Sequence, residues 1–218
     1  MVLRQKVSVT GAGRTDTGVH ARHMACHFDL DTQLDTTHLA FRLNSVLPAD
    51  IAVSRVCVVA PDWHARFSAT SRTYHYYITT HKSPFNRNYA LRLYFALDVE
   101  LMNEAASLLL SHQDFGCFCK SHSDNKTNIC HVTQAQWTTM DDGTLCFTIS
   151  ANRFLRNMVR AIVGTLIEVG KHRMDVEGFR QVLMSGKRTK AGESVPAHGL
   201  FLEEVAYDNT TFEEGGND

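Results

Sequence analysis

A hairpin pattern near the centre of the chain most restricts the folds that the sequence can adopt. Two strand-like segments, residues 128–140 (NICHVTQAQWTTM) and 144–152 (TLCFTISAN), flank an Asp-Gly turn at Asp142 and Gly143. Helical patterns lie on both sides, at residues 99–110 (VELMNEAASLLL) and 153–170 (RFLRNMVRAIVGTLIEVG). Because antiparallel strands alternate with helices, the sequence predicts an α+β fold rather than a run of βαβ crossovers.

Shorter patterns complete the expected elements. We expect Thr37 to cap a helix that Pro48 ends, and Asp98 to open the helix over residues 99–110. We expect the helix over residues 153–170 to end at Gly170. The acidic, Gly-rich segment 208–218 is expected to be disordered. The other expected strands are residues 6–10, 23–30, 51–60, 72–81 and 199–207, and the other expected helices are residues 38–47 and 175–186.

Composition excludes several function classes. The 218 residues carry 22 basic and 23 acidic side chains, so any surface that binds nucleic acid must be a local one. The sequence has no apolar run of the roughly 18 residues that a membrane span needs, and MVLRQKVSV lacks the apolar core of a signal peptide. Six cysteines, at positions 26, 57, 117, 119, 130 and 146, show no framework spacing. We therefore expect a cytoplasmic protein with reduced thiols.

The glycine-rich stretch GAGRTDTGVHA, residues 11–21, follows the first expected strand. The dinucleotide fingerprint fails because Asp16 stands where its third glycine is needed, and a P-loop fails because Val19 and His20 follow Gly18. One interpretation is a turn in which Asp16 binds local amides. The other is a reactive carboxylate, since Arg14 and His20 nearby favour its ionised form.

Histidines and cysteines raise the alternative of a zinc site. His20, His23, Cys26 and His27 lie close together in sequence, but no C-x-x-C pair or H-E-x-x-H motif is present. On the expected strand His23 and His27 share a face and Cys26 points away. A zinc-binding motif is likewise absent from the group Cys117, Cys119, Cys130 and His131. Scattered histidines and small buried cysteines are the favoured interpretation.

Four segments in order resemble the tRNA pseudouridine synthase A family: residues 11–21 (GAGRTDTGVHA), 67–78 (FSATSRTYHYYI), 152–170 (NRFLRNMVRAIVGTLIEVG) and 185–205 (SGKRTKAGESVPAHGLFLEEV). The resemblance implies isomerisation of uridine to pseudouridine at tRNA positions 38, 39 and 40, in the anticodon stem-loop. It also implies a homodimer that uses no cofactor and no metal. The implied fold is two ferredoxin-like halves, with a largely antiparallel mixed sheet and a central RNA-binding cleft.

The resemblance also implies site residues. Asp16 is the expected catalytic aspartate, Tyr74 the tyrosine at the base, and Arg160 the partner of the aspartate. The sequence alone leaves Asp16 open as a nucleophile toward the ribose or the base, or as a base that yields a glycal. Without the resemblance, Tyr74 reads as a packed core tyrosine and Arg160 as an arginine that reaches out from an apolar helix. The expected RNA-binding residues are Arg14, Tyr74, Arg22, Lys187, Arg188 and Lys190, with Arg153 and Arg156 adding positive charge.

We expect residues 1–66 to form an N-terminal half with the catalytic loop, and residues 67–207 a C-terminal half with Tyr74 and Arg160. The family has a strand and a helix before the GRTD motif, and we expect this sequence to lack them, which leaves a sheet edge unpaired. A non-catalytic module that binds or folds tRNA is the alternative function. The retained Asp16 favours the enzyme, because RNA binding alone has no use for a carboxylate that repels phosphate.

Overall fold

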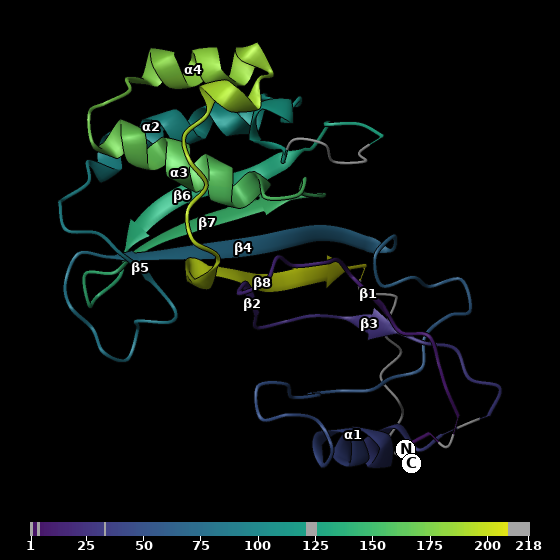
Figure 1. The fold of residues 1–218 in the computed structure, drawn as a ribbon. Coiled ribbons are helices and arrows are strands. Elements are labelled where there is room, and N and C mark those ends of the chain that lie inside the picture. The colour runs from purple at the N-terminus through teal and green to yellow at the C-terminus, as the bar shows by residue number, and fades with distance from the viewer. Residues whose placement is uncertain (1, 4, 33, 121–125, 209–218) are drawn as a thin grey trace. The chain divides into compact units, whose positions relative to one another are not determined.

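The computed structural model describes residues 2–3, 5–32, 34–120 and 126–208 (Figure 1). The chain forms two compact units whose segments interleave along the sequence. The larger unit contains residues 14–24 and 71–206, and the smaller one contains residues 1–13, 25–70 and 207–218. The expected halves 1–66 and 67–207, and their ferredoxin-like form, stay predictions. The expected disordered tail lies outside the described residues from residue 209 on.

The larger unit is built on a six-stranded sheet in the order β2-β8-β4-β7-β6, with β5 beside β4. β4 is antiparallel to β7, and β7 is antiparallel to β6, whereas β2 runs parallel to β8 and β5 parallel to β4. This mixed sheet, together with the helices, confirms the predicted α+β class. The strands are β2 (His20–Ala21), β4 (Ala69–Thr79), β5 (Leu91–Arg92), β6 (Val132–Thr139), β7 (Leu145–Ala151) and β8 (Leu200–Tyr207).

The central hairpin forms as the sequence predicts. Gly143 adopts a φ of +79°, a conformation that glycine reaches without steric cost. The amide of Thr144 donates to Oδ1 of Asp142 over 2.9 Å, which fixes the turn between β6 and β7. Strand β6 of this hairpin forms one edge of the sheet, and α2 packs against β6.

The helices α2 (Val99–Ser107), α3 (Met158–Gly170) and α4 (Val176–Ser185) lie on one side of this sheet (Figure 1). Alternation along β4 directs Tyr76 and Ile78, both fully buried, into the core. The core also contains Met102 of α2, Phe147 of β7 and Ile162 of α3.

No helix among the described residues is long and apolar enough to cross a membrane.

Two helix starts differ from the sequence prediction. α3 begins at Met158 rather than residue 153, because Asn157 adopts a left-handed conformation with φ 65° and interrupts the helix. α1 (Thr36–Asn44) is capped by Asp35 rather than Thr37: Oδ1 of Asp35 accepts from the amide of His38 over 2.9 Å. The predicted cap at Asp98 is confirmed, since its side chain accepts from the amide of Leu101.

The strands predicted in the smaller unit are mostly wrong. The segments 6–10 and 23–30 contribute only the two-residue strands β1 (Thr10–Gly11) and β3 (Cys26–His27), which pair antiparallel. Residues 51–60 form no strand. Both backbone groups of Val53 bind the side-chain amide of Asn44, at 2.7 and 2.8 Å, in place of a neighbouring strand. β propensity alone therefore does not make a strand of this segment.

Candidate active site

Asp16 lies in a tight turn within the glycine-rich loop. The amide of Val19 donates to the carbonyl of Asp16 over 3.0 Å, and Gly18 adopts a φ of +85° at the third position of this turn. Only a residue that tolerates positive φ suits that position, which explains the glycine. The turn leaves the Asp16 side chain 28% exposed.

Arg160, in the first turn of α3, holds one oxygen of this carboxylate. Its Nη1 donates to Oδ2 of Asp16 over 3.1 Å, and its Nε donates to the carbonyl of Val195 over 2.7 Å. The Arg160 side chain is only 21% exposed. A guanidinium that is fixed at two points in a partly buried setting fixes the orientation of its carboxylate partner. The structure therefore contains the contact between Asp16 and Arg160 that the resemblance implies.

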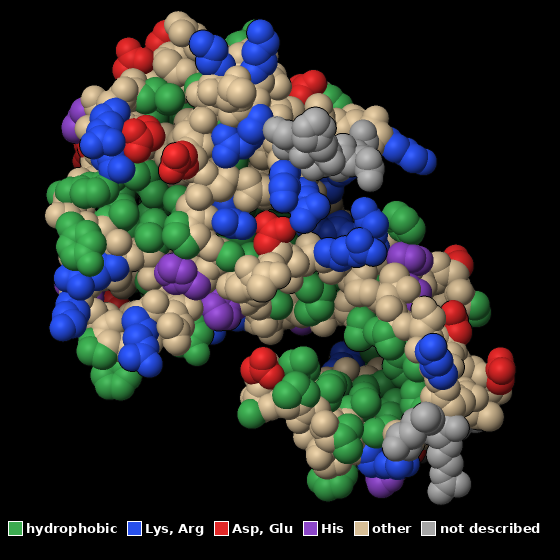
Figure 2. Space-filling model, in the orientation of Figure 1, with side chains coloured by type: hydrophobic (Ala, Val, Ile, Leu, Met, Phe, Trp, Pro, Cys, Tyr) green, Lys and Arg blue, Asp and Glu red, His purple; other side chains and the backbone are tan. Residues whose placement is uncertain are grey.

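The second oxygen of Asp16 is less engaged. Nε of Arg156 lies 3.8 Å from Oδ1, too far for a hydrogen bond, and the Arg156 side chain is 62% exposed. Around this oxygen the chain forms a pocket of about 810 Å³. Its walls carry one acidic side chain among several cationic ones, and Lys and Arg side chains gather around it on the surface (Figure 2). The lining residues are Asp16, Thr17, Lys120, Arg156, Asn157, Arg160 and Arg188.

Tyr74 of β4 does not line this pocket, but the charge of Asp16 acts on its hydroxyl. Burial raises the pKa of the Tyr74 hydroxyl to about 12, Arg72 opposes this rise, and the negative charge of Asp16 adds to it. The ring packs edge-on against Phe154, with centroids 5.2 Å apart. Tyr74 therefore carries a neutral hydroxyl at physiological pH.

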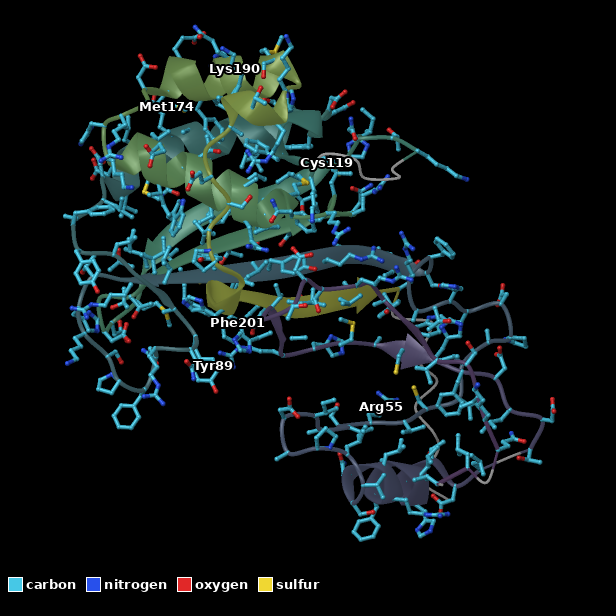
Figure 3. All side chains as sticks on the ribbon, viewed as in Figure 1. Arg55, Tyr89, Cys119, Met174, Lys190 and Phe201 are labelled. Atoms are coloured by element: carbon cyan, nitrogen blue, oxygen red, sulfur yellow. The ribbon has the colours of Figure 1, made fainter. Side chains whose placement is uncertain are left out.

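The remaining predicted RNA-binding residues lie in different settings. Arg14 is exposed. Arg22 is engaged on the sheet: its Nε lies 3.2 Å from Oε2 of Glu203, and its guanidinium lies over the ring of Phe201, which is beside Tyr89 (Figure 3). The 3₁₀ helix η3 (Arg188–Lys190) and the residue before it place Lys187 and Lys190 on the surface and Arg188 in the pocket wall.

Sequence reasoning assigned no role to three residues of the pocket, namely Thr17, Lys120 and Asn157. Lys120 directly follows Cys117 and Cys119 in the chain, and its amide donates to the carbonyl of Arg156 over 3.0 Å. Asn157 enters through the left-handed backbone that precedes α3. Thr17 and Asn157 lie within the segments that carry the resemblance, whereas Lys120 has no signal in sequence and reaches the pocket through long-range packing.

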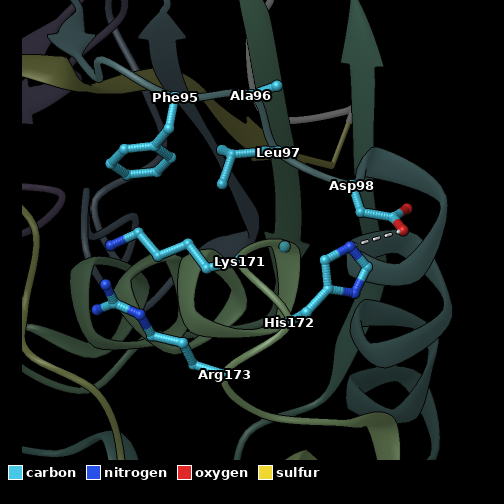
Figure 4. Close-up of a pocket in the computed structure, with 8 residues that line it drawn as sticks. Phe95, Ala96, Leu97, Asp98, Lys171, His172 and Arg173 are labelled. Carbon is cyan, nitrogen blue, oxygen red and sulfur yellow. Dashed lines mark ion pairs between the residues drawn. The ribbon is translucent and has the colours of Figure 1, made fainter.

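A second hollow, of about 610 Å³, lies where α3 ends (Figure 4). Two of its polar side chains lie in pairs. Nε2 of His172 lies 3.4 Å from Oδ2 of Asp98, and Nζ of Lys171 lies 3.1 Å from Oε1 of Glu168. None of the residues predicted for the site lines this hollow. We therefore place the candidate active site at the pocket around Asp16.

The described residues contain no group of three or more His, Cys, Asp or Glu side chains placed to hold a metal ion. Burial raises the pKa of the Cys117 thiol to about 12 and that of Cys130 to about 11, so these thiols stay protonated. Such cysteines behave as small apolar core residues.

Comparison with known proteins matches the chain to one family. The family described as tRNA pseudouridine synthase matches residues 105–208, which include Arg156, Arg160 and Arg188. The curated tRNA pseudouridine synthase A of Bacteroides thetaiotaomicron is 57% identical over 214 residues, covering 97% of this chain and 80% of the relative. The chain belongs to the tRNA pseudouridine synthase A family. Its match to the protein of the same name from Bacillus subtilis is 36% identical, covering 94% of this chain and 84% of that relative.

This membership agrees with the resemblance found in the sequence, and it extends over the glycine-rich loop, which the relatives' alignments cover. In this member of the tRNA pseudouridine synthase A family, Asp16 and Arg160 come from segments 144 residues apart and meet in one pocket.

Proposed function

We propose that this chain isomerises uridine to pseudouridine in tRNA, with Asp16 as the catalytic carboxylate. The observation that carries this proposal is the state of the two Asp16 oxygens. Oδ2 is held by Arg160 at 3.1 Å, whereas Oδ1 has no hydrogen bond among the described residues and faces Arg156 at 3.8 Å. One oxygen is thus oriented and the other remains available to a substrate.

The reaction needs what this pocket supplies. The bond from the ribose to a nitrogen of the base breaks, a bond from the ribose to carbon 5 forms, the proton on carbon 5 leaves, and the freed nitrogen takes up a proton. No electrons are lost or gained. A carboxylate can begin the reaction by attacking the ribose or the base, or by removing a ribose proton, and each route needs the ionised form of Asp16. Arg160 binds one oxygen of this carboxylate at 3.1 Å, in a setting that is partly screened from water.

We propose that Tyr74 contacts the base after it leaves its stack. An aromatic face can stack on a flipped uracil, and the hydroxyl can assist the late proton transfer at carbon 5. The pKa of about 12 supports a role as a neutral donor or acceptor rather than as a tyrosinate. Arg14, which is exposed, is proposed to fill the gap that the flipped base leaves in the RNA.

The substrate that we propose is the anticodon stem-loop, with the target uridines at positions 38, 39 and 40. Lys187 and Lys190 are exposed cations close to the pocket wall, and they are proposed to contact phosphates. Arg22 and Arg188 were expected to contact RNA as well. Arg22 already pairs with Glu203 at 3.2 Å, and the Arg188 guanidinium already donates to Gly192 and Ser194, each at 3.0 Å. We further propose a cytoplasmic homodimer whose two ferredoxin-like halves form a central RNA-binding cleft.

Mapping of pseudouridine tests the substrate proposal. Unmodified tRNA transcripts with uridine at position 38, 39 or 40 would be incubated with the chain, treated with a carbodiimide that marks pseudouridine, and read by primer extension. We expect stops at these three positions and none at uridines elsewhere. Stops only elsewhere would overturn the proposed position. Tight binding of the tRNA without any stop would instead support the alternative, a module that binds or folds tRNA.

A further inference from the structure

A segment of five residues, 191–195, runs along α3 and is here called the strap. Beside Arg160 it exchanges two hydrogen bonds with the helix: the carbonyl of Val195 accepts from Nε of Arg160 over 2.7 Å, and the amide of Val195 donates to the carbonyl of Arg160 over 3.2 Å. Further along, the amide of Gly192 donates to Oγ1 of Thr165 over 2.9 Å. The position of the strap therefore fixes the plane of the guanidinium that binds Asp16.

Close backbone contact leaves the strap little freedom on the side of the helix. A Cβ atom at Gly164 would lie 1.7 Å from the carbonyl oxygen of Glu193, and one at Gly192 would lie 3.0 Å from Cα of Thr165. Both glycines thus let main chain pack directly on main chain. On its other side, the strap is held by a side chain.

That side chain is Arg188. Its Nη1 donates to the carbonyl of Gly192 over 3.0 Å and to that of Ala191 over 3.4 Å, and its Nη2 donates to Oγ of Ser194 over 3.0 Å. Oγ of Ser194 also accepts from Nδ2 of Asn157 over 2.5 Å, which ties the same point to the residue before α3. A planar fork with several fixed donors suits this set of acceptors, and a lysine cannot reproduce it. The Arg188 guanidinium is thus used on the strap, although it stands in the pocket wall.

We propose that Arg188 is a positioning residue, which holds the strap so that Arg160 stays aligned with Asp16. This inference rests on the proposed function, because its effect is on the step that Asp16 carries out. It gives Arg188 a different task from Lys187 and Lys190, which flank it on the same turn. Within the described part of the chain, the side chains of these lysines make no hydrogen bond to the strap, whereas that of Arg188 does. Arg188 acts through Val195 and Arg160 rather than by binding a phosphate.

The test compares kcat, KM and the salt dependence of tRNA binding for Arg188→Gln and Arg188→Lys, with Lys190→Gln as the matched loss of one charge. Tritium release from tRNA labelled at carbon 5 of uridine reports kcat. We expect both Arg188 variants to lower kcat roughly tenfold to a hundredfold, because a small misplacement of a catalytic group has effects of this size. Their affinity for tRNA and its salt dependence should match the wild type, which also shows that they fold. Lys190→Gln should raise KM. It should also reduce the salt slope, which is the slope of log affinity for tRNA against log salt concentration, by about the share that one phosphate contact contributes.

A second variant keeps the proposal testable if the Arg188 variants fold poorly. Ser194→Ala removes one hydroxyl, to which both Arg188 and Asn157 donate, and it should lower kcat in the same direction without changing the salt slope. Wild-type kcat in Arg188→Lys, or a loss of affinity and salt slope in Arg188→Gln with kcat unchanged, would overturn the positioning role. Absence of tritium release from the wild type would instead contradict the proposed function itself.

Discussion

Replacement of Gly164 by alanine in α3 should destabilise the chain, although helix propensity predicts the opposite. In an ordinary helix interior, alanine is favoured over glycine by about 1 kcal/mol. At this position the new Cβ would lie 1.7 Å from the carbonyl oxygen of Glu193, whereas real Cβ contacts essentially never fall under 3.0 Å. The strap must therefore move away by at least ~1.3 Å, because the opposing atom belongs to the backbone.

The cost follows from the hydrogen bonds that this movement breaks. The bonds from Arg160 to Val195, from Gly192 to Thr165 and from Asn157 to Ser194, at 2.7, 2.9 and 2.5 Å, would all be stretched beyond hydrogen-bonding range. At about 1 kcal/mol each they contribute roughly 3 kcal/mol, which exceeds the propensity gain by about 2 kcal/mol. For a chain of this size, such a loss lowers the thermal midpoint by roughly 4–8 °C.

Thermal unfolding of Gly164→Ala, followed by circular dichroism, would measure this shift. Gly178→Ala in α4 is the control for a contact with side chains, because the atoms nearest to its new Cβ, at 3.0 Å, belong to Asp175 and Met174. Asp175 caps α4 through the amide of Gly178 at 2.7 Å, so a loss of up to about 1 kcal/mol at this cap is offset by a gain of about 1 kcal/mol in helix propensity. We expect the control to stay close to the wild type. A midpoint for Gly164→Ala equal to or above that of the wild type would refute the direct packing of the strap on α3.

Three further predictions concern the tyrosines and the exposed lysines. Burial raises the pKa of Tyr74 to about 12, so stability should be full below about pH 10 and fall as the pH rises towards 12, since only the unfolded chain releases the proton; Tyr74→Phe should flatten this fall in thermal midpoints measured across that range. Tyr76→Phe removes the bond from the buried hydroxyl to the carbonyl of Pro196, 2.9 Å long, and should cost about 1–2 kcal/mol in urea unfolding; a neutral result would contradict that bond. Replacing Lys187 and Lys190 together by glutamine should weaken tRNA binding and lower its salt slope by nearly the share that two phosphate contacts contribute. Unchanged affinity would show that neither lysine belongs to the RNA interface.

Local signals explain which parts of the fold could be predicted from sequence. Asp98 caps α2 and the Asp142-Gly143 pair turns the hairpin through bonds to residues two or three positions away, so a short stretch of sequence specifies each of them. The strand expected over residues 51–60 failed because a strand also needs a partner, and Asn44 binds Val53 instead. A sequence pattern indicates which element a segment can form, but it does not identify the segment that will pair with it.

The residues of the candidate site also fall into two groups, those that a sequence motif identifies and those that only long-range contacts bring to the site. The family resemblance identified Asp16 and Arg160, whose side chains the structure brings to 3.1 Å. The roles of neighbouring residues depend on contacts that no motif encodes. Arg188 reads as one more cation in a basic loop, yet its donors bind the strap, and Lys120 reaches the pocket from a segment without a recognisable pattern.

The most direct test of the whole account is tritium release from tRNA labelled at carbon 5 of uridine, measured for the wild type, Asp16→Asn and the control Asp141→Asn. Asp141 is an exposed acid in the hairpin turn, so its variant changes the same charge at a position away from the pocket residues. We predict release by the wild type and Asp141→Asn, and none by Asp16→Asn even when it is saturated with tRNA. Release by Asp16→Asn at the wild-type rate would show that this carboxylate is not the reagent.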